Sequence, residues 1–218
     1  MGTITVSTII SDARGILQDN DSNDYTWSAA DLIRYINDGQ RNIILLKPDA
    51  YITSAAVQLA AGTKQTVADG IGLVKLTRFM GSDGSTPGRV INFVPWEQMN
   101  YIDTDWHAAS TSATPEIYTY DQDDPTHFYV YPPQPSSGMG YVEEVYKAIP
   151  SIIDETTDTL SLNDIYYSAV LNYVLYRAYQ RENDAISDSL SQKYYNLYVT
   201  EIGRKDLADA KSNPSHKG

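Results

Sequence analysis

The stretch WSAADLIRYINDGQRNIILLKP, residues 27–48, carries the clearest structural signals in the chain. Ser28 is predicted to be the N-cap of a helix, and Asp31 is placed three residues later to complete a capping box. Trp27 precedes the cap and Leu32 stands at the fourth helical position, which is the spacing of a hydrophobic staple. Apolar residues then recur at helical spacing until the final proline ends the helix.

A second apolar stripe precedes this helix. Its members recur at helical spacing and are Val6, Ile9, Ile10, Ala13, Ile16 and Leu17. The loop QDNDSNDYT, rich in Asp and Asn, separates the two helices. Residues 1–52 are therefore predicted to form an N-terminal helical hairpin.

The pattern changes in residues 53–150, where short β-favouring runs alternate with Gly, Asp-Gly and Pro-Gly turn signals. The expected strands lie at 73–79 and 90–94, on both sides of the sequence QDDP, and in GYVEEVYKAIP. Prolines concentrated between residues 115 and 135 exclude a helix there. This segment is predicted to be an inserted β domain.

The segment THFYVYPPQP, residues 126–135, allows three interpretations. Its P-x-x-P pattern is typical of a polyproline ligand, and its aromatic residues could form a binding surface. We favour a strand that the prolines end, because proline cannot donate a ladder hydrogen bond.

Helical spacing returns in residues 151–203, which are predicted to form a C-terminal helix pair. The first of these helices opens around Leu160–Ile165, and Asn183 or Asp184 caps the second. The expected apolar stripe of the last helix consists of Ile186, Leu190, Tyr194, Leu197 and Ile202. The predicted fold class is α+β: a four-helix bundle formed by the N- and C-terminal helix pairs, with an inserted β domain and a flexible C-terminal arm at 204–218.

Tyrosine is over-represented, with 18 copies against 3 phenylalanines. Five tyrosines go around more than one face of the helix that follows residue 160, namely Tyr166, Tyr167, Tyr173, Tyr176 and Tyr179. One face can serve the bundle core, and the others are predicted to be subunit-interface candidates, because tyrosine suits half-buried surfaces.

The composition argues against several functional classes. A formal charge of −12 is unfavourable for bulk nucleic-acid binding, and the absence of cysteine excludes thiolate chemistry. No catalytic motif is present, so we expect no enzymatic activity and no catalytic, cofactor-binding or metal site. Asp103, Asp105 and His107 are better explained as a solvated loop than as metal ligands. We expect no membrane span and no secretory signal, hence synthesis in a cytoplasm.

An ordered set of motifs nevertheless resembles one family. The opening STIISDARGILQDNDSNDYTWSAADLIRYINDGQRNIILLKPDA is followed in order by AAGTKQTV, GSDGSTPGRVI, HFYVYPP and IYYSAVLNYVLYRAYQREND. Together they span roughly residues 5–200 and resemble the phage head–tail adaptor, or connector, family. This family is similar to the tail tubular adaptor proteins of short-tailed phages and to head-completion connectors.

The resemblance implies a structural virion protein at the head–tail junction. Such a protein forms a dodecameric ring between the portal protein and the next tail component, a nozzle or a tail terminator. DNA passes through the lumen without specific binding, and no membrane or enzymatic activity is involved. The resemblance also implies a portal-binding C-terminal arm with Arg204, Lys205, Leu207, Ala208, Ala210 and Lys211 as contact residues. The alternative is a Tyr-rich acidic carbohydrate-binding module of a phage tail, with Trp27, Trp96 and Trp106 as a sugar platform.

Overall fold

The computed structural model describes residues 2–181 and 185–212, and only the backbone of residues 205–212. The chain forms two compact units. Residues Met1–Tyr51 and Pro150–Gly218 make up one of them, here called the helical unit, and residues Ile52–Ile149 make up the other, the β unit. The described residues contain both helices and two sheets, so the predicted α+β class is confirmed.

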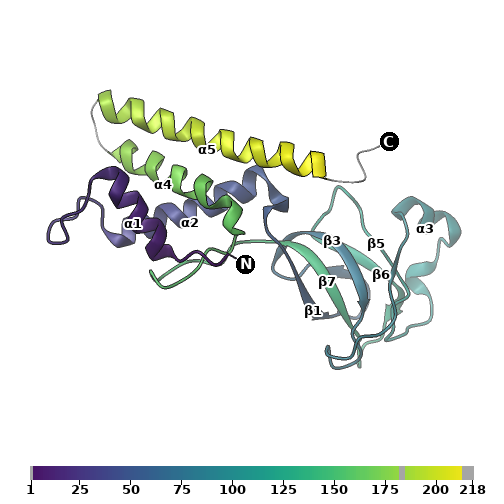
Figure 1. The fold of residues 1–218 in the computed structure, drawn as a ribbon. Coiled ribbons are helices and arrows are strands. Elements are labelled where there is room, and N and C mark those ends of the chain that lie inside the picture. Colours follow the sequence, from purple (N-terminus) through teal and green to yellow (C-terminus); the bar gives the residue numbers. More distant parts are fainter. Residues whose placement is uncertain (1, 182–184, 213–218) are drawn as a thin grey trace. The chain divides into compact units, whose positions relative to one another are not determined.

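The helical unit consists of helices from the two ends of the chain (Figure 1). Its elements are α1 (Val6–Leu17), α2 (Ala29–Leu46), the 3-10 turns η1 (Pro48–Ala50) and η3 (Asp164–Tyr166), α4 (Tyr167–Arg181) and α5 (Ala185–Ser212). Helix α4 packs against α1, α2 and α5, and Val170 and Val174 on α4 are fully buried. The core of this unit is therefore built around α4.

The segment before α4 is tied to the N-terminal helices by hydrogen bonds that join distant parts of the sequence. The buried Gln40 side chain accepts from the Ser161 N–H at 2.9 Å. Asn37 donates to the Ile153 carbonyl at 2.8 Å and accepts from the Ile153 N–H at 2.9 Å. These side chains on α2 satisfy backbone groups of a segment that has no regular structure of its own.

Helix α5 differs from the prediction in its buried face. Ile186 and Leu197, expected in the core, are 74% and 39% exposed, whereas Tyr198 is fully buried. Ser187, Ser191 and Ile202 complete the buried face, and with Tyr198 they are spaced four, seven and four residues apart, as on one helical stripe. The pattern was missed because two of the buried positions are serines, which a search for apolar residues passes over. The predicted caps Asn183 and Asp184 lie outside the described residues.

The same helix continues as far as Ser212. The arm predicted to begin at residue 204 therefore starts within α5, and its first nine residues have helical backbone. The segment was expected to be flexible because it is polar, but a polar sequence can extend a helix that is already nucleated by a packed segment.

The β unit contains two sheets whose strands are far apart in sequence (Figure 1). The first has the order β1–β7–β3 and consists of β1 (Ile52–Gln58), β7 (Tyr141–Ala148) and β3 (Gly70–Phe79). The second has the order β2–β6–β5–β4 and consists of β2 (Gly62–Thr66), β6 (His127–Gln134), β5 (Ile117–Thr119) and β4 (Asn92–Phe93). All neighbouring strands are antiparallel except β4 and β5, which are parallel.

One hydrophobic core is shared by the two sheets. Its buried residues are Leu59, Val67, Leu73, Leu76, Ile91, Tyr118, Phe128, Val130 and Val142. The strand expected at 90–94 is shortened to Asn92–Phe93, and helix α3 (Trp96–Ile102) with the 3-10 turn η2 (Trp106–Ala108) follows it. These two elements were not predicted, since their short apolar patterns carry no strong helical period.

Strand β6 corrects the prediction for the segment THFYVYPPQP. The strand does not end at the prolines: Pro132 and Pro133 both lie within it. Its register against β2 shifts between the pairs Lys64↔Tyr129 and Gly62↔Gln134, and the prolines lie inside this irregularity. Ladder bonds are interrupted at such a bulge, so proline costs no hydrogen bond there.

Candidate functional site

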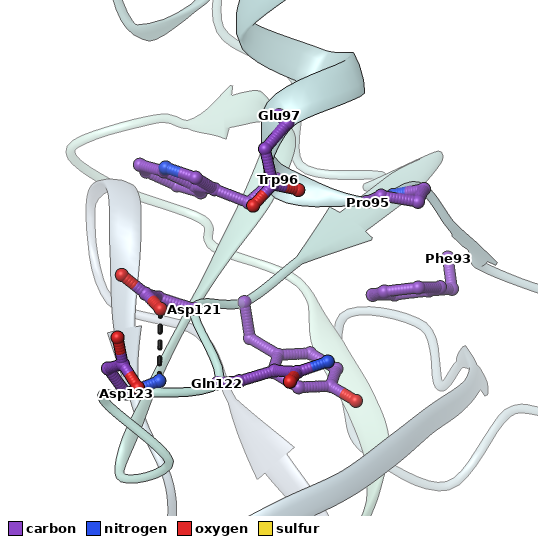
Figure 2. Close-up of a pocket in the computed structure, with 8 residues that line it drawn as sticks. Phe93, Pro95, Trp96, Glu97, Asp121, Gln122 and Asp123 are labelled. Atoms are coloured by element: carbon purple, nitrogen blue, oxygen red, sulfur yellow. Dashed lines mark hydrogen bonds between the residues drawn. The ribbon is translucent and has the colours of Figure 1, made fainter.

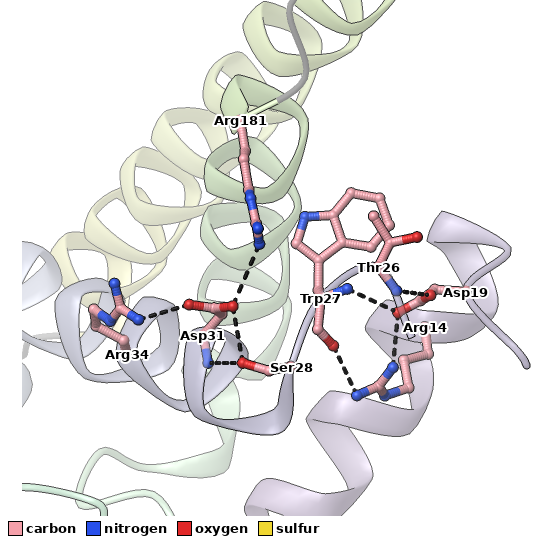
Figure 3. A network of polar contacts seen from close by, with 8 residues as sticks. All are labelled: Arg14, Asp19, Thr26, Trp27, Ser28, Asp31, Arg34 and Arg181. Carbon is pink, nitrogen blue, oxygen red and sulfur yellow. Dashed lines mark hydrogen bonds and ion pairs between the residues drawn. The ribbon is translucent and has the colours of Figure 1, made fainter. Parts of the chain in front are cut away.

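The start of helix α2 is one of the regions singled out from the sequence (Figure 3). Ser28 is the N-cap, and its hydroxyl oxygen accepts from the Asp31 N–H at 3.1 Å and donates to the Asp31 carboxylate at 2.8 Å. Arg34 at 2.6 Å and Arg181 at 3.3 Å pair with the same carboxylate. The Ser28 hydrogen bond and these two guanidinium groups hold the pKa of Asp31 below its usual value. Asp31 thus joins the start of α2 to the end of α4.

Trp27 and Leu32, the residues of the predicted staple, are both buried. A buried ion pair that the sequence did not indicate lies beside Trp27 (Figure 3). Arg14 contacts Asp19 at 2.7 Å and donates to the Trp27 carbonyl at 2.9 Å, while Asp19 accepts from the Thr26 N–H at 2.8 Å. This network fixes the loop between α1 and α2.

The five tyrosines proposed as interface candidates lie in or next to α4, and none of them is exposed. Tyr166 and Tyr173 are buried. The other three, Tyr167, Tyr176 and Tyr179, are half-buried. The structure brings several of them onto tyrosines of α5 rather than leaving a bare face.

Aromatic contacts between α4 and α5 show how the second tyrosine face is covered. The ring centroids of Tyr173 and Tyr198 are 5.2 Å apart, and those of Tyr176 and Tyr195 are 5.1 Å apart. Such aromatic pairs contribute beyond their buried area. The packing of these tyrosines is therefore explained within one chain, and their role at a subunit interface remains a prediction.

The predicted portal-binding residues belong to the end of α5. Arg204 is paired with Glu201 of the same helix at 3.0 Å. The side chains of Lys205, Leu207, Ala208, Ala210 and Lys211 lie outside the described residues, so their contacts stay a prediction.

The β unit contains a surface pocket of about 270 Å³ that the sequence did not reveal (Figure 2). It is lined by Phe93, Pro95, Trp96, Glu97, Tyr120, Asp121, Gln122 and Asp123. The first four residues come from the β4–α3 connection and the last four from the turn between β5 and β6. Parallel pairing of Phe93 with Tyr118 brings the two segments together. Only a long-range strand pair forms this pocket, so no local signal in the sequence could have found it.

Aromatic contacts support both ends of the pocket. The Phe93 ring lies 5.3 Å from the Tyr120 ring, and the Trp96 ring lies 4.7 Å from the Tyr129 ring. Trp106, which is buried, makes an edge contact with Trp96 at 6.0 Å. Trp96 is thus held in place by a packed aromatic cluster.

The other sequence candidates are not gathered into one site. Of the three tryptophans considered for a sugar platform, Trp27 and Trp106 are buried, and only Trp96 lines a pocket. His107 bonds Thr63 at 2.8 Å, and Asp103 accepts from the Asp105 N–H. Among the described residues no group of three or more potential ligands is arranged to hold a metal ion.

A search for long apolar helices in the described part of the chain found none able to cross a bilayer.

Comparison with known proteins gave one family. The family model described as "SU10 adaptor protein" matches residues 4–217, which is nearly the whole chain. No curated protein matches the chain. The family match confirms the resemblance to phage head–tail adaptors that the ordered motifs indicated.

Proposed function

We propose that this chain, which belongs to the SU10 adaptor protein family, forms a ring of twelve copies between the portal protein and the tail of a phage particle. The match over residues 4–217 is the observation that carries the proposal, since the family is one of phage adaptors, which are structural components. In this role the ring is a conduit for DNA, and the protein is incorporated at the head–tail junction of the virion.

One physical feature supports a ring and another supports a DNA conduit. Each subunit of a closed ring uses one surface to contact its neighbour and a different surface to receive the next. The helical unit provides a stiff body for such contacts because α4 packs against three other helices and the buried Arg14–Asp19 pair fixes the α1–α2 loop. The formal charge of −12 suits a channel through which DNA slides without being held, because phosphates gain affinity mainly from basic side chains.

Two partners follow from this position in the particle. The portal protein lies on the head side, and we propose that the end of α5, with Arg204, Lys205, Leu207, Ala208, Ala210 and Lys211, contacts it. The next tail component, a nozzle or a tail terminator, lies on the other side.

The test mixes the purified chain with portal rings of the same phage and examines the product by negative-stain electron microscopy and mass measurement. We expect one additional ring of twelve copies stacked on the portal. The chain alone and the portal alone are the controls. Portal rings that gain no density, or isolated copies attached without a closed ring, would contradict the proposal.

A further inference from the structure

The pocket in the β unit has an unbalanced charge. Glu97, Asp121 and Asp123 line it, and none of these carboxylates is paired with a basic side chain of the described residues. The only hydrogen bond drawn between the pocket residues joins the Asp123 N–H to the Asp121 carboxylate at 3.0 Å (Figure 2). Carboxylates in this position raise the local negative potential, which attracts a cation.

The same pocket presents aromatic surface. Phe93 is 46% exposed although its ring packs on that of Tyr120, and Trp96 faces the side of the pocket where Asp121 and Asp123 lie (Figure 2). A cation placed over an aromatic face is attracted by the electrons of the ring, and the effect grows as water is removed. Aromatic faces and carboxylates together therefore favour one class of ligand, a flat or compact organic cation.

The size of the pocket limits the ligand further. Its volume of about 270 Å³ is below the range of roughly 300–1,000 Å³ that holds a drug-sized ligand. It can accept one long side chain, but it is small for an oligosaccharide. A neutral sugar would also leave the charge of Glu97, Asp121 and Asp123 uncompensated.

We propose that this pocket binds the guanidinium side chain of an arginine presented by a different protein chain. A guanidinium is planar and stacks on aromatic rings, and its N–H groups pair with carboxylates in a fixed geometry. Arginine and aromatic residues are also the side chains that dominate protein interfaces. The proposal concerns the chemistry of the pocket and does not depend on the ring proposed above.

The charge of the chain indicates that the arginine comes from another protein. A chain with a net charge of −12 attracts a basic partner. Among the described residues Arg41 is the one arginine without a carboxylate partner, and the remaining arginines form ion pairs within their own chain. A second copy therefore has almost no free guanidinium to offer.

Helix α3 extends the surface beyond the pocket. Trp96 and Glu97 at its start line the pocket, and Tyr101 and Ile102 at its end are 90% and 67% exposed. Exposed apolar residues beside a pocket that anchors one side chain are typical of a protein contact, in which the anchor lies among further apolar contacts. This supports a protein as the source of the arginine.

The first experiment uses N-acetyl-arginine amide as the probe and the indole N–H resonance of Trp96 in the full chain as the readout. For a ligand of this size we expect saturable binding with a Kd on the order of 1 mM. The matched probe N-acetyl-citrulline amide has nearly the same shape without the charge, and it should not saturate the site. N-acetylglucosamine tests the sugar alternative.

Variants then assign the binding to the pocket. Asp121→Asn should weaken binding by roughly threefold, as expected for an ion pair near the surface. Phe93→Leu should weaken it by roughly threefold by removing an aromatic face while keeping the apolar volume. Asp24→Asn in the helical unit removes the same charge elsewhere and should leave the affinity unchanged, and unaltered spectra of the other residues verify that each variant is folded.

Several outcomes would overturn the proposal. One is that the arginine and citrulline probes shift the Trp96 resonance equally. Another is that only N-acetylglucosamine shifts it. A third is that Asp24→Asn weakens binding of the arginine probe as much as Asp121→Asn does. Sedimentation of the chain alone tests which protein supplies the arginine. If the chain self-associates and Arg41→Gln abolishes the self-association, the pocket is occupied by Arg41 of a second copy. That result would contradict the proposal that a different protein is the partner. A chain that stays monomeric and binds the arginine probe supports the proposal.

Discussion

Replacing the buried Glu144 with glutamine should remove a pH dependence from the stability of the β unit. Glu144 lies on β7, is 0% exposed, and has Ala55 of β1 and Leu76 of β3 as its strand neighbours. One carboxyl oxygen accepts from the Ala68 N–H at 3.2 Å, and the other has no hydrogen-bond partner among the described residues. A charge in such surroundings is costly, because burial penalises the ionised form.

The size and sign of the effect follow from this burial. Burial raises the pKa of Glu144 to about 7 from the ordinary 4.5, and the Ala68 hydrogen bond offsets only part of the rise. Between these values the folded protein holds a proton that the unfolded chain has lost, so the free energy of unfolding falls as pH rises. At about 1.4 kcal/mol per pKa unit, the loss amounts to roughly 3 kcal/mol and is complete above about pH 7.

The assay is urea unfolding at pH 4.5, 6 and 8, followed by tryptophan fluorescence in a Trp27→Phe background. In that background Trp96 and Trp106 remain, and both belong to the β unit. We expect the parent protein to lose roughly 3 kcal/mol more than the Glu144→Gln variant between pH 4.5 and pH 8. Glutamine keeps an oxygen acceptor for the Ala68 N–H but cannot ionise.

The control is Glu143→Gln, the same substitution at the neighbouring position of β7. Glu143 is partly exposed and paired with Arg78 at 3.1 Å. The Glu143→Gln variant therefore measures how stability changes when the same strand loses a carboxylate that is not buried. If the parent and Glu144→Gln lost stability in parallel as pH rises, the buried carboxyl would not be the cause and the reasoning would be refuted.

Three further substitutions and one truncation test other parts of the molecule. Asp19→Ala leaves the buried Arg14 without its partner and should destabilise the helical unit by about 3–5 kcal/mol in urea unfolding, and a loss below about 1 kcal/mol would contradict a structural role for the pair. Trp27→Ala should lower the free energy of unfolding by about 3–5 kcal/mol, and Ser28→Ala should lower it by about 1 kcal/mol. Equal melting temperatures for the two variants would show that the indole is not a core residue. Truncation after Gly203 should leave the fold intact by circular dichroism and sharply reduce binding to the portal ring, and undiminished binding would place the contact elsewhere.

Local signals in the sequence determined much of the helical unit and part of the β unit. Ser28 caps α2 as predicted from its place before an apolar periodic run, because a cap depends only on the next three residues. The strands on both sides of QDDP pair as β5 and β6, since a short turn between two β-favouring runs leaves little choice of partner. The ordered motifs also indicated the adaptor family, which the match over residues 4–217 confirms.

Tertiary structure decided the features that depend on residues far apart in the chain. The buried face of α5 includes Ser187, Ser191 and Tyr198, and contacts with α4 such as the Tyr173–Tyr198 ring pair and the Ser191 hydrogen bond to the Tyr176 carbonyl select it, which hydrophobicity alone does not reveal. Glu144 is buried because it lies on the same face of β7 as Val142, which belongs to the hydrophobic core of the β unit. The pocket between Phe93 and Asp121 exists only through the pairing of β4 with β5, and such long-range pairing is set by the free energy of the whole core rather than by the sequence of either segment.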